Sequence, residues 1–337
     1  MRTKGITFDT GFISAGISTR EHFDTGVVRR EIGIIRDDLH CTAVRVTGGD
    51  RERLRIASAM VAEAGMAVWV SPFTCDLTTG ELLDFLADCA VWAEELRAGG
   101  ADVVFLTGSE IAMFTIGFLP GDTIAERLAL LADPPRMRAA VAAVPSLVDD
   151  FLTKAVAVVR ERFGGPVGYA SIPFERVDWT PFDIVATDGG YRSAEVAHVY
   201  ADGMKALVAQ GKPVAITEFG CATYRGSADQ GARGDHILRW RDGMPYALTG
   251  EPVRDEAEQA TCIAELFGIL DEAGVDAAFV CTLARYDLPH RDDPARDLDM
   301  ASNGIVKIID GGSGTAYPGL PWEPKAAFET VARLYGQ

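Results

Sequence analysis

Residues 213–220 of this 337-residue chain read PVAITEFG, and residues 103–110 read VVFLTGSE. Each stretch is a short apolar run followed by a small polar residue and then a glutamate, Glu218 in the first and Glu110 in the second. Continuous apolar runs of this length are typical of parallel strands that are covered on both faces. A glutamate just after such a strand lies at the carboxyl end of the sheet, where α/β enzymes carry their chemistry.

Similar strand-like runs recur along the whole chain and alternate with helical stretches. In the helical stretches apolar residues share one face, as Leu54, Ala57 and Val61 do. Glycines such as Gly65 and Gly274 stand just before several runs, where a helix ends. The eight predicted strands cover residues 5–12, 41–47, 67–72, 103–107, 167–172, 184–187, 214–217 and 277–282.

Two architectures satisfy this alternation, a closed (β/α)8 barrel and an open doubly wound sheet. An open sheet usually carries a Gly-x-Gly-x-x-Gly turn after its first strand, but this first strand ends in Asp9, Thr10 and Gly11 without that spacing. We therefore favour an α/β fold with a single TIM barrel over residues 1–337. Its long loops are predicted after strands four, seven and eight, at residues 114–138, 221–252 and 283–321.

Composition argues against several classes of partner and cofactor. The formal net charge is −17 and no lysine or arginine cluster stands out, so nucleic acid and anionic membrane surfaces are poor partners. No apolar run approaches the roughly 20 residues of a membrane helix, and no secretory signal is visible. The six cysteines and five histidines are scattered, which favours a cytoplasmic protein without a metal site or other cofactor.

Two carboxylates that face each other across a barrel mouth suit glycoside hydrolysis. The protonated one donates its proton to the leaving oxygen, and the ionised one attacks the anomeric carbon. A separation of about 5–5.5 Å between the carboxyl groups leads to retention of configuration. Repulsion between the two charges raises the pKa of one group, which suits the acid.

With these motifs the chain resembles clan A of the glycoside hydrolases, and residues 216–220 are similar to the nucleophile strand of that clan. The resemblance implies a retaining enzyme with Glu110 as acid/base and Glu218 as nucleophile. It further implies that Arg45, on strand two, lies near the nucleophile and that Tyr191, after strand six, donates a hydrogen bond to it.

The chain departs from that clan at two places. Ser109 stands where the clan has asparagine before the acid/base, and residues 280–285 lack the tryptophan that ends strand eight. Both departures remove a usual sugar contact. Residues 5–12 and 71–76 also resemble bacterial proteins labelled abortive infection proteins.

Other polar and aromatic residues that follow predicted strands are candidates for substrate binding. Asp9 ends strand one, Glu175 follows strand five, and Arg285 is a candidate contact for an anionic group. Trp179 and Trp240 are candidate stacking platforms for a sugar. Simpler interpretations also exist. Asp9 could stabilise its own turn, Glu175 could form an ion pair at the rim, and each tryptophan could serve only in packing. The substrate-binding candidates are Asp9, Arg45, Ser109, Glu175, Trp179, Tyr191, Trp240 and Arg285.

These observations favour a retaining glycoside hydrolase or transglycosidase that acts on a small soluble glycoside. One alternative keeps Glu110 and Glu218 as acid and base in a lyase, isomerase or cyclase of a specialised pathway. A second alternative is a non-catalytic binding or defence protein on the same scaffold.

Overall fold

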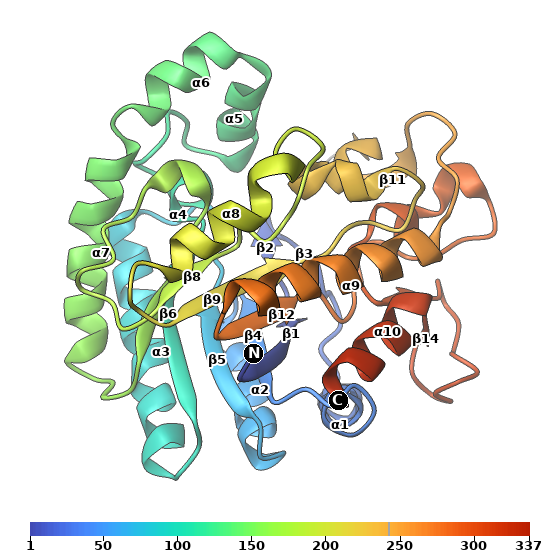
Figure 1. Ribbon diagram of the computed structural model, residues 1–337, viewed down its shortest axis with the longest axis horizontal. Coiled ribbons are helices and arrows are strands. Elements are labelled where there is room, and N and C mark those ends of the chain that lie inside the picture. Colours follow the sequence, from blue (N-terminus) through green and yellow to red (C-terminus); the bar gives the residue numbers. More distant parts are fainter. Residues whose placement is uncertain (242) are drawn as a thin grey trace.

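The computed structural model describes residues 1–241 and 243–337 and contains eight parallel strands curved into a nearly closed barrel (Figure 1). The order of strands around the barrel is β7-β6-β5-β4-β1-β12-β9-β8. These strands are β1 (Thr3–Asp9), β4 (Ala43–Gly48), β5 (Ala67–Pro72), β6 (Val103–Ser109), β7 (Val167–Ala170), β8 (Val185–Thr187), β9 (Val214–Phe219) and β12 (Ala277–Val280).

The two edge strands, β7 and β8, meet through a few hydrogen bonds just beyond their ends. The amide of Ser171 donates to the carbonyl of Ala186 at 3.3 Å, and the amide of Asp188 donates to the carbonyl of Ser171 at 2.8 Å. Each of the eight strands overlaps its predicted range, and β5 has the predicted bounds. The predicted TIM barrel is confirmed.

Seven longer helices lie outside the strands, and short polar residues start several of them. Asp50 accepts the amides of Glu52 and Arg53, and Thr78 and Glu81 form a capping box. These helices are α1 (Thr25–Asp37), α2 (Arg51–Glu63), α3 (Thr79–Ala98), α7 (Val144–Arg160), α8 (Ala197–Val208), α9 (Glu256–Ala273) and α10 (Ala326–Tyr335). Between β7 and β8 the structure has only the 3₁₀ helix η2 (Pro173–Glu175).

Additional elements follow the carboxyl ends of four strands, and α5 and α6 lie beyond the barrel at the top of Figure 1. The loop after β1 holds β2 (Ile13–Ser14) and β3 (Ile17–Ser18). After β6 come α4 (Ile111–Phe114), α5 (Ile124–Ala129), η1 (Leu130–Ala132) and α6 (Pro134–Val141). After β9 come η3 (Ser227–Asp229), η4 (Gly231–Ile237), β10 (Leu238–Arg241) and β11 (Met244–Leu248). After β12 come η5 (Pro294–Arg296), η6 (Leu298–Ala301), β13 (Val306–Ile308) and β14 (Trp322–Pro324).

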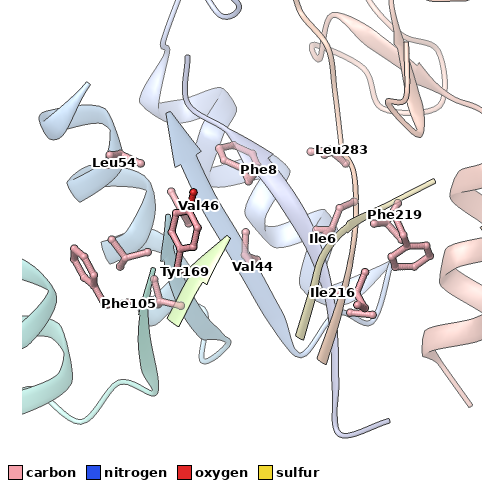
Figure 2. Packing of buried hydrophobic residues seen from close by; sticks show 14 of the residues in the cluster. Ile6, Phe8, Val44, Val46, Leu54, Phe105, Tyr169, Ile216, Phe219 and Leu283 are labelled. Carbon is pink, nitrogen blue, oxygen red and sulfur yellow. The ribbon is translucent and has the colours of Figure 1, made fainter. Parts of the chain in front are cut away.

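Strand alternation divides the buried side chains into an outer and an inner set. Figure 2 shows part of the outer set, in which Val44 and Val46 of β4 pack with residues such as Leu54 of α2. Ala43 belongs to the inner set, so Arg45, two residues further along β4, also points into the barrel. The inner set comprises Ala43, Trp69, Val104, Leu106, Ala170, Ile184, Ala186, Ala215, Ala277 and Phe279.

No helix in residues 1–241 and 243–337 is long and apolar enough to cross a membrane.

We predict that Phe279→Ala lowers the free energy of unfolding by about 3–5 kcal/mol, since Phe279 is fully buried inside the barrel. Its ring packs on Trp69 with centroids 4.9 Å apart, and truncation leaves a cavity there. Urea unfolding measures the change. Val91→Ala, at a position 48% exposed, is the control and should change stability by less than about 0.5 kcal/mol. Equal effects of the two substitutions would contradict the inner packing.

Candidate active site

The guanidinium of Arg45 on β4 lies inside the barrel and is fully buried. Its Nη1 donates to Oε1 of Glu218 at 2.7 Å and to the carbonyl of Thr217 at 3.1 Å. Its Nη2 donates to Oγ of Ser109 at 2.9 Å, and its Nε donates to Oγ of Ser71 at 3.0 Å. One side chain from β4 therefore connects the ends of β5, β6 and β9.

Asp188, just after β8, brings a second carboxylate to this guanidinium. Its Oδ1 lies 3.1 Å from Nη1 of Arg45, and its Oδ2 accepts the hydroxyl of Ser109 at 2.7 Å. Burial raises the pKa of Asp188 to about 6; the charge of Arg45 acts in the opposite direction, and that of Glu218 adds to the rise.

Asp188 is not among the residues predicted from the sequence, although a signal is present. Thr187 ends β8 and Asp188 follows it, which repeats the pattern of a threonine and then an acidic residue that Thr217 and Glu218 form on β9.

Glu218 is held by a hydrogen bond at each carboxylate oxygen. Oε1 accepts from Arg45, and Oε2 accepts the hydroxyl of Tyr191 at 2.9 Å. Nδ2 of Asn303 donates to the same tyrosine oxygen at 3.4 Å. The side chain of Glu218 remains 14% exposed, so this fixed carboxylate is open to a ligand. Arg45 and Tyr191 occupy the places that the family resemblance implied.

Glu110 follows β6 and adopts a left-handed backbone conformation, with φ 47° and ψ 40°. This conformation is uncommon for a residue other than glycine and often marks a functional position. Burial raises the pKa of Glu110 well above its usual 4.5, and the charges of Asp188 and Glu218 add to the rise. The two predicted catalytic glutamates thus lie within electrostatic reach, one paired with a cation and the other favoured in its protonated form.

A buried network supports the turn that carries Glu110. The amide of Ile111 donates to the hydroxyl oxygen of Tyr169 at 2.9 Å, and the amide of Ala112 donates to Oε1 of Glu175 at 2.9 Å. The hydroxyl of Tyr169 donates to the same Oε1 at 2.7 Å. These two side chains therefore satisfy the free amides at the start of α4, directly after Glu110.

The predicted substrate-binding role of Glu175 is corrected by this network. Glu175 is fully buried, and its second oxygen accepts the amide of Ile172 at 2.9 Å. Burial raises the pKa of Glu175 to about 7, while its hydrogen bonds lower it. Because both oxygens serve the protein interior, Glu175 positions the loop of Glu110 and does not contact the substrate.

Trp179 is also corrected, because it lies at the other end of the barrel. Its carbonyl accepts a hydrogen bond from Nζ of Lys212 at 2.6 Å, and Lys212 lies two residues before the amino end of β9. Without a long helix between β7 and β8, the chain returns along the barrel as a loop, and Trp179 falls on its far part. There it packs on Phe182, with ring centroids 5.6 Å apart.

The remaining predicted residues are Asp9, Arg285 and Trp240, and Asp9 lies within electrostatic range of Arg285 and Asp287. Asp9 accepts the amide of Gly11 at 2.8 Å and the hydroxyl of Thr19 at 2.5 Å, so it stabilises its own turn. Arg285 forms a two-point ion pair with Asp287, at 2.9 and 2.7 Å. Trp240 is 54% exposed on β10. Their contacts with a substrate stay predictions.

Within residues 1–241 and 243–337, no group of three histidine, cysteine, aspartate or glutamate side chains is arranged to hold a metal ion. At the candidate site the guanidinium of Arg45 supplies the positive charge between Asp188 and Glu218.

No protein-family model matches the chain, and no curated protein matches it in sequence. Solved structures do match its fold. A GH113 β-1,4-mannanase is similar with a TM-score of 0.63 and 17% identity over 100% of both chains. The GH113 β-mannanase of Alicyclobacillus acidocaldarius gives 0.59 and 14%, over 99% of this chain and 97% of that one. A GH2 β-galacturonidase from Eisenbergiella tayi gives 0.55 and 15%, over 100% of this chain and 51% of that one.

At these identities the similarity concerns the fold. The chain has a (β/α)8 barrel of the kind found in clan A glycoside hydrolases, which agrees with the resemblance drawn from its sequence.

We predict that Arg45→Met lowers the free energy of unfolding by about 3–5 kcal/mol at pH 8, because two carboxylates lose their buried counter-charge. The loss should be smaller at pH 5. The pKa of Asp188 is about 6 in the folded protein and roughly 3.9 in an unfolded chain, so the folded state holds its proton more tightly and stability falls as pH rises through this window. The charge of Arg45 lowers the pKa of Asp188 in the folded protein, so the removal of Arg45 raises this pKa and extends the window to higher pH.

Urea unfolding at the two pH values measures this difference. Arg29→Met is the matched control, because Arg29 pairs with Glu63 on the surface and both side chains are 60% exposed. A loss for Arg45→Met that is equal at pH 5 and pH 8 would show that the ion pair is not the cause.

Proposed function

We propose that this protein is a retaining glycoside hydrolase or transglycosidase that acts on a small soluble glycoside, with Glu218 as nucleophile and Glu110 as acid/base. One observation carries the proposal, the contrast between the two carboxyl groups. Glu218 is bound by Arg45 and Tyr191, whereas burial and neighbouring charges raise the pKa of Glu110. Retaining glycosidases need one ionised and one protonated carboxyl group.

In the first step of this reaction, an oxygen of Glu218 attacks the anomeric carbon while Glu110 gives its proton to the glycosidic oxygen. The bond from the anomeric carbon to the leaving group breaks, and a glycosyl ester forms on Glu218. In the second step Glu110, now ionised, takes a proton from water or from an acceptor hydroxyl as that oxygen attacks the anomeric carbon. The ester bond to Glu218 breaks and both glutamates return to their starting states.

Arg45 and Tyr191 hold the attacking carboxylate in place, and neither exchanges a proton in these steps. The barrel similarity to β-mannanases and a β-galacturonidase supports a sugar substrate. Asp9, Trp240 and Arg285 remain the proposed outer contacts to the substrate. All six cysteines lie in the described part of the chain and are free thiols, which supports a cytoplasmic location.

A second candidate is a lyase, isomerase or cyclase that uses Glu110 and Glu218 as acid and base. The observation that favours it is the burial and hydrogen bonding of Ser109, which stands where clan A has asparagine. Its hydroxyl donates to Asp188 and is 3% exposed, so it offers no proton to a sugar hydroxyl.

We predict that a 2-deoxy-2-fluoro glycoside with a dinitrophenyl leaving group labels Glu218. The fluorine slows the second step more than the first, and the activated leaving group does not need the proton of Glu110. Intact-mass analysis and peptide mapping locate the adduct. Glu218→Gln is the control and should remain unlabelled. Absence of labelling across a panel of fluoro sugars, with no turnover of aryl glycosides, would favour the second candidate.

Glu110→Gln should lower kcat by about 10²–10⁴-fold on an unactivated glycoside. The loss should be much smaller on a dinitrophenyl glycoside, whose leaving group departs without protonation. Steady-state rates on the two substrates test this contrast. A similar loss on both substrates would remove Glu110 from the acid role.

We predict that Glu175→Gln shifts the basic limb of the pH profile of kcat/KM to lower pH. The acid must be protonated, so activity falls as pH rises through the pKa of Glu110, and the charge of Glu175 contributes to raising that pKa. The positions of α4 and Glu110 also depend on Glu175, so kcat should fall in parallel. Glu161→Gln, on the exposed end of α7, is the matched control and should leave the limb in place. An unchanged basic limb in Glu175→Gln would contradict the electrostatic coupling.

A further inference from the structure

Three phenylalanine side chains form a partly exposed cluster at the carboxyl end of the barrel, and we call Phe12, Phe73 and Phe114 the aromatic trio. Phe12 follows β1, Phe73 follows β5 and Phe114 belongs to α4. Their ring centroids lie 4.8 Å apart for Phe12 and Phe73, 4.9 Å for Phe73 and Phe114, and 5.4 Å for Phe12 and Phe114.

The backbone beneath the trio is held by contacts that only glycine permits. Gly48 has φ +154°, and a Cβ there would lie 2.3 Å from Oγ1 of Thr10. The amide of Phe73 donates to the carbonyl of Gly48 at 2.8 Å, and the amide of Gly49 donates to the carbonyl of Gly11 at 2.9 Å. The loops after β1, β4 and β5 are therefore tied together, which fixes the places of Phe12 and Phe73.

The trio extends beyond the hydrophobic core. Phe114 packs against the main buried cluster, whereas Phe12 and Phe73 pack on Phe114 and on each other. All three side chains are partly exposed. Aromatic surface held in contact with water in this way is typical of a ligand-binding surface.

A cavity of about 350 Å³ adjoins the trio. Ile13 and Thr74, the residues that follow Phe12 and Phe73, contribute to its lining. The apolar residues Leu77 and Phe85 also line it, and Gly49, Cys75 and the charged residues Arg51 and Glu81 complete it. This volume lies within the usual range of small-molecule sites.

The position of the trio relative to Glu110 indicates which part of a substrate the three phenylalanine rings would contact. Phe114 lies one helical turn from Glu110, whose carbonyl accepts the amide of Phe114 at 3.1 Å. In a retaining glycosidase the acid protonates the leaving oxygen, so the leaving group lies on the side of the acid.

We propose that the aromatic trio, with the adjoining apolar residues Ile13, Leu77 and Phe85 of the cavity, binds the leaving group of the substrate, and that this group is an apolar aryl or alkyl aglycone instead of a second sugar. The rings of the trio meet at interplanar angles of 59°, 85° and 87°, so they form a corner and not the flat platform on which a sugar ring stacks. Phenylalanine also has no polar atom that binds sugar hydroxyls. The inference rests on the proposed function for the assignment of this group as a leaving group.

A binding experiment tests whether the trio forms an apolar ligand site, and a kinetic experiment tests whether the ligand of this site is the leaving group of the substrate. The binding probe is 2-naphthol, titrated by calorimetry into the full chain and into the Phe73→Ala and Phe12→Ala variants. Burial of one such side chain contributes about 1.5–3 kcal/mol, so each variant should bind roughly 10–100-fold more weakly. Trp179→Ala is the matched control, a half-buried aromatic residue at the other end of the barrel, and should bind as the parent does. Circular dichroism establishes that the variants are folded.

The kinetic probes are the naphthyl and methyl glycosides of the sugar that the fluoro-sugar panel identifies. Phe73→Ala should lower kcat/KM for the naphthyl glycoside about 10-fold or more and lower it for the methyl glycoside by a much smaller factor, because a methyl group makes little contact with the ring. Unchanged naphthol binding in both trio variants, or a loss only in Trp179→Ala, overturns the proposed site. Trio-dependent naphthol binding without any labelling of Glu218 supports an apolar ligand site and rejects the glycosidase function.

Discussion

The ion pair between Arg45 and Glu218 is the interaction on which the candidate site depends. A guanidinium inside a barrel is stable only when its donors and its charge are satisfied, and Arg45 achieves this with side chains from across the barrel mouth. Two strands, β1 and β12, lie between β4 and β9 in the barrel wall, so this contact spans the interior. It orients Glu218 and at the same time holds Asp188 beside it.

This charge arrangement also distinguishes the two glutamates. One cation serves Glu218 and Asp188. Desolvation raises the pKa of the partly buried Glu110, and the negative charge of these two neighbours adds to the rise. The left-handed backbone of Glu110 is supported by a separate network, in which Tyr169 and Glu175 accept the amides at the start of α4. The short connection between β7 and β8 supplies Glu175, so a segment that lacks the usual long helix positions the proposed acid.

The residues around this pair differ from those that the resemblance to clan A implied. Ser109 is part of the Arg45 network, and the small Cys281 stands at the end of β12 next to Tyr191 and Glu218. Three partly exposed phenylalanine side chains, Phe12, Phe73 and Phe114, instead meet beside the helix α4 that follows Glu110. This barrel, whose fold is similar to that of the mannanases, therefore carries residues that differ from those the resemblance implied, which is common among proteins of one fold.

The eight strands, their parallel arrangement and the placement of Glu110 and Glu218 at the barrel mouth could be predicted from the sequence, because apolar runs and the polar residues that end them are local features. The sequence also led, through resemblance, to Arg45 and Tyr191. Three features follow from the three-dimensional fold and were not predicted: Asp188 pairs with Arg45, Glu175 is buried beneath α4, and Trp179 lies at the far end of the barrel. These features depend on the path of one loop and on contacts between residues up to 173 positions apart in the sequence. Burial in the folded protein then raises the pKa values of Glu175 and Asp188.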